Sequence, residues 1–393
     1  GAPSFGLRKL YWTETGWPSL AEVSTDWKGT LNDGWGQAGN WWDAAVPDGV
    51  GQVATFGSRT ATRRTVQVDA TGRTVGTANF SGAGSFTVAG NGTLTLDAIT
   101  GESATLNALS GSHRIDARVT SVDRLGVNVA TSARLTVGGP LTAPGLTKYG
   151  YGTLGLYGTG AINGTLLVKW GTLEIGGTVR SSQYTSVGAI LAENATLTVR
   201  ANGSFTAASD LNIGDTGNAD DTATGTLFLQ DNGQITVESA GGFFVGSGFF
   251  ANTKASGTVF QTGGTLTVNA DFDGGFVIGG RTSSLPVGVY HLDGGGVIAN
   301  TNVQVGGRGS GTIDQTAGSF AANGFVAIGR HAGSVGEWTV SGGTVTQNGA
   351  SRRLIVGEGG VGTLTLAGAG RVSLAGPLQI SSLSSSSGTV NLD

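Results

Sequence analysis

The chain of 393 residues is rich in glycine and poor in charge. Glycine accounts for 72 residues, about 18% against about 7% in typical proteins, and charged residues make up 12% against about a quarter. An apolar content of 38% with a net charge of −4 excludes a disordered chain, and the lack of basic tracts argues against a nucleic-acid partner. No apolar run has the length of a membrane-spanning helix.

The sequence contains no cysteine, which excludes disulfide frameworks, thiol nucleophiles and cysteine-ligated zinc. This composition fits an extracellular protein that folds without disulfides, with a cysteine-free cytosolic protein as the alternative. The chain begins at Gly1 instead of a methionine, so we expect it to be processed, with any signal peptide already removed.

Residues 1–50 differ from the rest because they hold six of the eight tryptophans. A stack of strands exposes core and strand edges at its end, so we interpret 1–50 as a Trp-rich N-terminal cap and 51–393 as the strand-rich domain. The alternative is a carbohydrate-binding platform on Trp35, Trp41 and Trp42. The six tryptophans are Trp12, Trp17, Trp27, Trp35, Trp41 and Trp42.

Residues 90–210 contain short segments in which apolar and polar residues alternate, as in half-buried strands. The clearest are 93–96, 134–137, 153–156, 172–175 and 196–199. Within them, Lys148-Tyr-Gly-Tyr-Gly-Thr-Leu-Gly-Leu-Tyr-Gly158 resembles the autotransporter-associated β-strand repeat, and Gly164-Thr-Leu and Gly171-Thr-Leu repeat its strand. The resemblance implies a secreted or surface-displayed bacterial β-helix with an adhesive or structural role.

From Gly225 onward the sequence repeats with a loose period near 26 residues. Each unit has three short apolar segments separated by glycine or polar turns, and the third segment ends in glycine. Three strands per turn predict an all-β fold, a parallel β-helix, whose crossovers should be right-handed. The units open at Gly225, Gly257, Gly288, Gly311, Gly336, Gly362 and Gly388.

The predicted coil has 12–14 turns, with small and β-branched residues facing its interior. One residue of each turn should stack on the equivalent residue of the next turn to form a single buried ladder. The residues predicted for this ladder are Val245, Ile278, Val305, Ile328 and Val356.

Asp215, Asp220 and Asp221 lie in one polar segment that could supply oxygen ligands to calcium, although an ordinary turn without a metal ion is the favoured interpretation. We expect no other cofactor. Acidic residues elsewhere are scattered among the units, with Asp271, Asp273 and Asp293 as the best group. We expect the three histidines, His113, His291 and His331, to lie on the surface. We therefore expect no enzyme, with a polysaccharide lyase or glycosidase as the alternative.

The chain ends in Gly388, Thr389, Val390, Asn391, Leu392 and Asp393, which begin a turn and stop after one strand. An unpaired strand edge is a template for another strand. We therefore expect an extracellular structural protein that assembles with itself into a surface fibre, sheath or adhesive layer. A carbohydrate-binding adhesin module, or a fragment of a longer monomeric adhesin, is the alternative.

Overall fold

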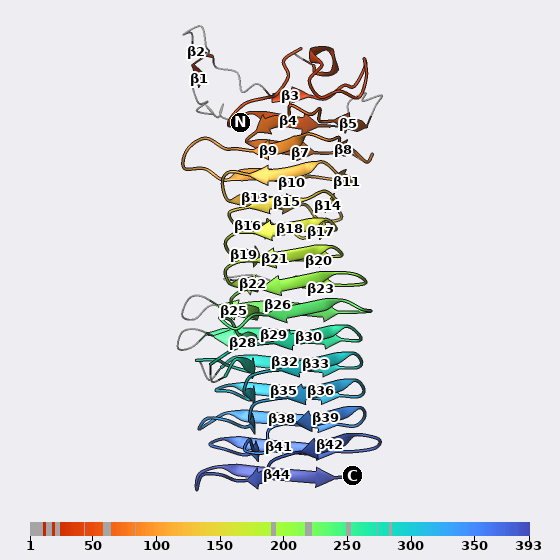
Figure 1. Ribbon diagram of the computed structural model, residues 1–393. Helices are drawn as coiled ribbons and strands as arrows, with labels where there is room; N and C mark the ends of the chain where they lie inside the picture. The colour runs from red at the N-terminus through yellow and green to blue at the C-terminus, as the bar shows by residue number, and fades with distance from the viewer. Residues whose placement is uncertain are drawn as a thin grey trace.

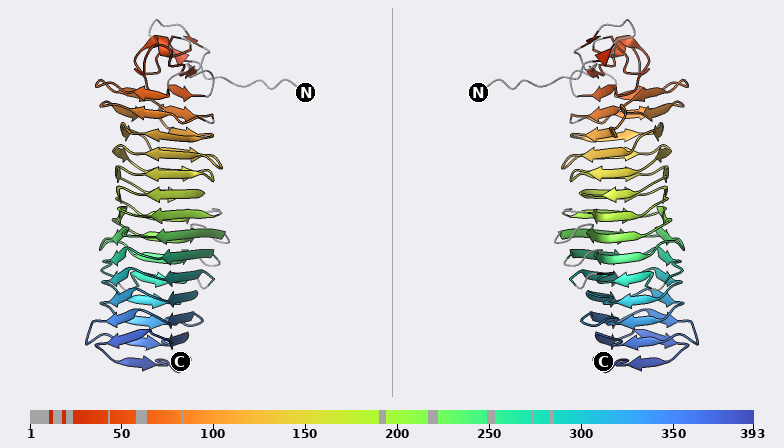
Figure 2. Two further views of the ribbon diagram at one scale, coloured as in Figure 1. Left: turned by 90° about the vertical axis from the view of Figure 1, so that its right-hand side faces the viewer. Right: turned by 90° about the vertical axis from the view of Figure 1, so that its left-hand side faces the viewer.

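The chain winds into a rod of stacked turns (Figures 1 and 2). This computed structural model describes residues 11–12, 18–19, 24–42, 44–57, 64–82, 84–189, 194–216, 222–248, 253–272, 274–282 and 285–393. Short strands β1 (Tyr11–Trp12) and β2 (Pro18–Ser19) pair antiparallel, and the other strands form three parallel sheets. The fold is a right-handed parallel β-helix, as predicted.

Each turn contributes one strand to sheet 1, then one to sheet 2 and one to sheet 3. Sheet 1 has 15 strands: β3 (Ser24–Asp26), β4 (Val53–Phe56), β7 (Thr77–Phe80), β10 (Ala104–Ala108), β13 (Leu125–Val129), β16 (Leu146–Tyr149), β19 (Leu166–Val168), β22 (Thr185–Ala189), β25 (Leu211–Thr216), β28 (Phe243–Gly248), β31 (Phe276–Ile278), β34 (Val303–Val305), β37 (Val326–Ile328), β40 (Leu354–Val356) and β43 (Leu378–Ile380). Sheet 2 has 14 strands: β5 (Thr65–Gln67), β8 (Thr87–Ala89), β11 (Ser112–Ile115), β14 (Arg134–Val137), β17 (Thr153–Leu156), β20 (Gly171–Ile175), β23 (Ala195–Val199), β26 (Thr222–Leu229), β29 (Lys254–Gln261), β32 (Val287–Leu292), β35 (Ser310–Gln315), β38 (Val335–Val340), β41 (Val361–Leu366) and β44 (Ser387–Leu392). Sheet 3 has 13 strands: β6 (Arg73–Val75), β9 (Thr93–Leu96), β12 (Arg118–Ser121), β15 (Leu141–Ala143), β18 (Thr159–Ile162), β21 (Thr178–Ser181), β24 (Ser204–Ala207), β27 (Gln234–Val237), β30 (Thr265–Val268), β33 (Gly296–Ala299), β36 (Ser319–Ala322), β39 (Thr344–Gln347) and β42 (Arg371–Leu374).

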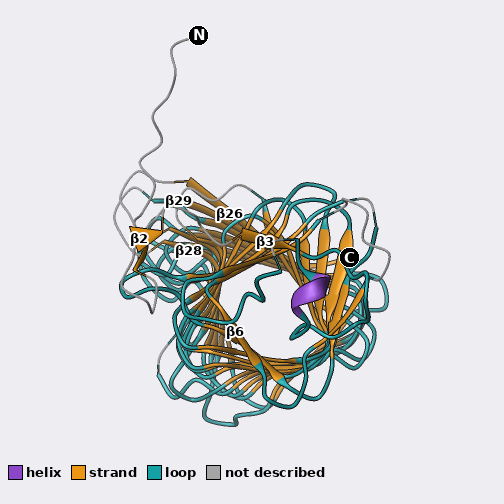
Figure 3. Cartoon of the chain, turned by 90° about the horizontal axis from the view of Figure 1, so that it is seen from above, coloured by secondary structure: helices purple, strands orange, loops and turns teal. Residues whose placement is uncertain are grey.

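The strands of the three sheets surround the axis of the coil, as the view along that axis shows (Figure 3). The buried apolar residues form one core cluster that runs the length of the coil. The predicted ladder is confirmed, because each of its residues pairs in register with the next and all are fully buried. The same column continues along sheet 1 in both directions. Its members from the N-terminal side are Ala54, Ala78, Leu106, Val127, Lys148, Val168, Val187, Ile213, Val245, Ile278, Val305, Ile328, Val356 and Ile380.

Two columns of glycine form the corner between sheets 1 and 2 in the C-terminal half, which we call the glycine seam. The glycines of one column lie within or directly after the strands of sheet 1. Their φ angles are between 67° and 80°, a region that residues with side chains rarely adopt. The other column is the predicted set of repeat openings, which pair in register from Gly225 to Gly388 as expected. The first column consists of Gly214, Gly246, Gly279, Gly306, Gly329 and Gly357.

The two columns touch so closely that no side chain fits between them. A Cβ atom on Gly336 would lie 2.1 Å from the carbonyl oxygen of Val305 and 2.4 Å from the amide nitrogen of Gly329. Those two atoms are themselves hydrogen-bonded, because Gly329 N–H donates to Val305 O at 2.8 Å. The glycine that opens each repeat therefore protects a hydrogen bond between neighbouring turns.

Residues 24–42 and 44–49, which we call the N-terminal segment, lie over the N-terminal end of the coil and contact β4, β5 and β6 of its first complete turn. The strand β3 pairs with β4, and Trp35 N–H donates to Gln67 O of β5 at 2.9 Å. Asp48 Oδ1 accepts the N–H of Thr74 in β6 at 2.9 Å. The short 3₁₀ helix η1 (Ala38–Asn40) belongs to this segment, and no helix in the described part of the chain is long and apolar enough to cross a membrane.

Candidate functional site

Trp35 and Trp41 are two of the three residues of the alternative carbohydrate-binding platform. Both are fully buried on the side of the N-terminal segment that faces the core. Their ring centroids lie 5.3 Å apart, and Trp35 also lies 5.3 Å from Phe56 of the core. Each indole N–H donates to a backbone carbonyl, Trp35 to Pro47 at 2.9 Å and Trp41 to Trp35 at 2.7 Å. The alternative interpretation as a carbohydrate-binding platform is therefore wrong for these two rings, which fill the end of the core, whereas Trp42 is 50% exposed.

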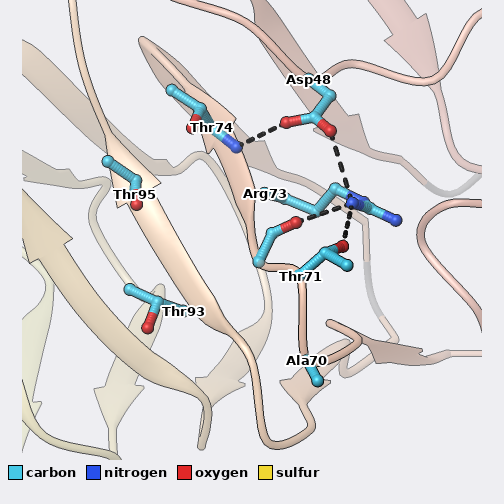
Figure 4. A pocket seen from close by; sticks show the side chains of 8 residues that line it. Asp48, Ala70, Thr71, Arg73, Thr74, Thr93 and Thr95 are labelled. Carbon is cyan, nitrogen blue, oxygen red and sulfur yellow. Dashed lines mark hydrogen bonds and ion pairs between the residues drawn. The ribbon is translucent and has the colours of Figure 1, made fainter.

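A groove of about 220 Å³ lies where the N-terminal segment meets sheet 3 (Figure 4). Its charged groups bind each other: Arg73 contacts Asp48 at 3.4 Å and Asp69 at 2.5 Å. A hydrogen bond from Thr71, together with the nearby Arg73, lowers the pKa of Asp69. The groove is therefore a polar joint between the N-terminal segment and the coil, lined by Asp48, Ala70, Thr71, Gly72, Arg73, Thr74, Thr93 and Thr95.

Asp215, the first residue of the predicted calcium segment, lies near the end of β25. Its Oδ2 accepts a hydrogen bond from Ser186 at 3.2 Å, and burial raises the pKa of its carboxyl to about 6. Asp220 and Asp221 lie outside the described residues. Over the described ranges, no group of three or more histidine, aspartate and glutamate side chains is placed to hold a metal ion. Calcium binding stays a prediction.

Two glutamates outside the predicted acidic group, Glu174 and Glu238, bind arginines on other turns. Glu174 is almost fully buried on the outer face of sheet 2 and contacts Arg134 at 3.1 Å and Arg200 at 3.4 Å. Glu238 pairs with Arg180 in the same manner across sheet 3. The pair of Glu174 with Arg200 joins adjacent turns, whereas the pairs with Arg134 and of Glu238 with Arg180 each span an intervening turn, so these carboxylates hold the stack together through charge-assisted hydrogen bonds. Asp273 lies outside the described residues.

The prediction that all three histidines lie on the surface is wrong for His113, which is 2% exposed. Its ring packs 5.3 Å from Phe80, its Nδ1 accepts the N–H of Phe86 at 3.2 Å, and its Nε2 lies 2.6 Å from Ser110 O. Burial lowers the pKa of this imidazole. The neutral ring with its proton on Nε2 satisfies both contacts, so His113 is a core residue.

Sequence reasoning gave no role to Lys148, although this residue occupies a fully buried position in the core column. Its ammonium donates hydrogen bonds to the carbonyls of Gly152 at 2.7 Å, Trp170 at 2.8 Å and Gly150. Burial lowers the pKa of Lys148 to about 7, whereas three acceptors for three N–H donors favour the ammonium form. The Lys-x-Gly-x-Gly spacing was the signal for this arrangement.

The C-terminal turn presents core positions to solvent. Ile380, the last residue of the core column, is 48% exposed, although its partner Val356 is fully buried. Leu392, near the end of β44, is 76% exposed. Comparisons with models of protein families, with curated protein sequences and with solved structures find no match to this chain.

Proposed function

We propose that the chain is a structural subunit of an extracellular bacterial fibre, sheath or adhesive layer, in which coils associate end to end. The observation that carries the proposal is the C-terminal turn, where β42, β43 and β44 are the last strands of their sheets. Each has one edge without a partner strand among the described residues. Such an edge accepts a further strand in the register that the coil already uses.

Apolar area at this end supports the same proposal. Covering the exposed part of these side chains, 48% of Ile380 and 76% of Leu392, would contribute about 1–2 kcal/mol each. The N-terminal end, by contrast, is covered by Trp27, Trp35 and Trp41. Association between two unlike ends is heterologous, and a heterologous contact that does not close into a ring produces a filament.

Electron microscopy and sedimentation of the native protein at neutral pH test the proposal. We expect filaments with an axial repeat close to the length of one subunit. The double variant Ile380→Lys, Leu392→Lys should remain monomeric, because charged side chains on an edge oppose strand addition. Val335→Lys is the matched control, since Val335 is 39% exposed on the side of the rod. Monomeric rods at high concentration would contradict assembly and favour a monomeric adhesin.

A further inference from the structure

We infer that the corner between sheets 1 and 2 at residues 149–170 binds an extended acidic glycan. The site consists of Tyr149, Tyr151, Lys169 and Trp170, which we call the aromatic corner. Most of the outer surface is built from Thr, Ser and Gly, whereas two of the five exposed aromatic rings with described side chains, Tyr149 and Tyr151, lie together at this corner. The five are Trp42, Tyr149, Tyr151, Tyr157 and Tyr184.

The rings of the aromatic corner lie on two adjacent turns. Tyr149 ends β16 and Trp170 follows β19, and their ring centroids are 6.0 Å apart. Tyr149 is 36% exposed and Tyr151 is 54% exposed, so both have ring surface open to solvent. Exposed aromatic rings on a polar surface mark binding sites, and the C–H face of a pyranose ring is a matching partner for them.

Polar groups continue the site along the axis of the rod. Asn107, Asn128 and Tyr149 pair in register on β10, β13 and β16, which lie on successive turns (Figure 1). Lys169 follows on the next turn, where its N–H donates to Lys148 O at 3.0 Å. Successive turns are about 4.8 Å apart, close to the length of one sugar residue in an extended glycan. A glycan parallel to the axis would meet amides, a ring and an ammonium in turn.

The charge of this corner favours an acidic glycan. Lys169 Nζ lies 5.7 Å from the centre of the Tyr149 ring, so cation and ring form one surface. The chain segments of the corner, 125–133, 146–152 and 166–171, contain no aspartate or glutamate. A carboxylate on the glycan would therefore meet the ammonium of Lys169 without a competing acidic side chain from these segments.

The buried Lys148 holds the aromatic corner in place from below. Two of its acceptors, Gly150 and Gly152, flank Tyr151, and the third is the carbonyl of Trp170. One ammonium thus fixes both backbone corners that carry the rings. Rings on a fixed backbone lose little conformational entropy on binding, which favours affinity.

Isothermal titration calorimetry of the whole chain with a galacturonate hexamer and with cellohexaose tests the inference. We expect both to bind, with the galacturonate hexamer binding more tightly. Tyr151→Ala should weaken both by about tenfold, as for a central aromatic contact. Lys169→Gln should weaken only the galacturonate hexamer. Tyr184→Ala is the matched control, since Tyr184 is 44% exposed at the corner between sheets 3 and 1.

Circular dichroism first establishes that each variant keeps the strand content of the native chain. Failure of both oligosaccharides to bind would overturn the inference. So would an equal loss of affinity in Tyr151→Ala and Tyr184→Ala. Equal or tighter binding of cellohexaose would overturn the preference for an acidic glycan. Each result is independent of whether the coils assemble end to end.

Discussion

Replacing Gly336 in the glycine seam by alanine should destabilise the coil far more than one methyl group normally does. The new Cβ would separate Gly329 N–H from Val305 O, the hydrogen-bonded pair between two turns. Leaving a buried donor and acceptor unpaired costs about 1–3 kcal/mol each, and the steric clash costs about 1–3 kcal/mol more. We expect Gly336→Ala to lower the free energy of unfolding by about 4 kcal/mol.

Gly126→Ala makes the same chemical change in a strand with room for it. A Cβ on Gly126 would have no neighbour closer than 3.7 Å, and its φ is not positive. We expect the free energy of unfolding to change by no more than about 1 kcal/mol, with alanine the more stable residue in a strand. Urea denaturation followed by far-ultraviolet circular dichroism compares the two variants. If Gly336→Ala unfolds at the same urea concentration as Gly126→Ala, the close contact in the seam does not exist.

Two further predictions concern buried positions. Ile328→Asp places an unpaired charge in the core column and should cost several kcal/mol; a thermal melt that coincides with wild type would show that Ile328 does not face the core. Asp215 has a pKa raised to about 6 in the folded chain, above the value of about 3.9 in an unfolded one. The folded state therefore binds more protons between these values, so stability should fall by about 2 kcal/mol as pH rises from 4 to 6. Asp215→Asn should remove this decrease in urea titrations across that range, and an unchanged pH dependence would contradict it.

The sequence predicts the fold well because each turn needs the same kinds of residue at the same positions as the next turn. Alternation in segments such as 93–96 identifies the buried residues, and a glycine at each opening identifies the register. The seam explains why Gly311 and Gly336 recur even where loop lengths change, since each protects a hydrogen bond between turns. These are local and repetitive signals, which sequence reasoning detects.

The candidate sites were harder to predict because exposure depends on contacts between distant segments. Trp41 and Trp42 are adjacent in the sequence, yet the first is buried and the second is half exposed. A lysine is expected on the surface. Inside the coil, however, the ammonium of Lys148 donates hydrogen bonds to the carbonyl of Trp170 and to two glycine carbonyls. No single-residue property distinguishes these cases before the turns are stacked.

The direction of the inter-turn hydrogen bonds has a mechanical consequence. Strands of all three sheets run across the rod, so the bonds between successive turns lie along its axis. A tensile load on the rod therefore acts on three rows of hydrogen bonds at once, and no turn lengthens independently of its neighbours. An interior turn is held on both sides, whereas a terminal turn is held on one. Under tension the rod should fail by losing turns from its ends, so the strength of the whole depends on how each end is covered.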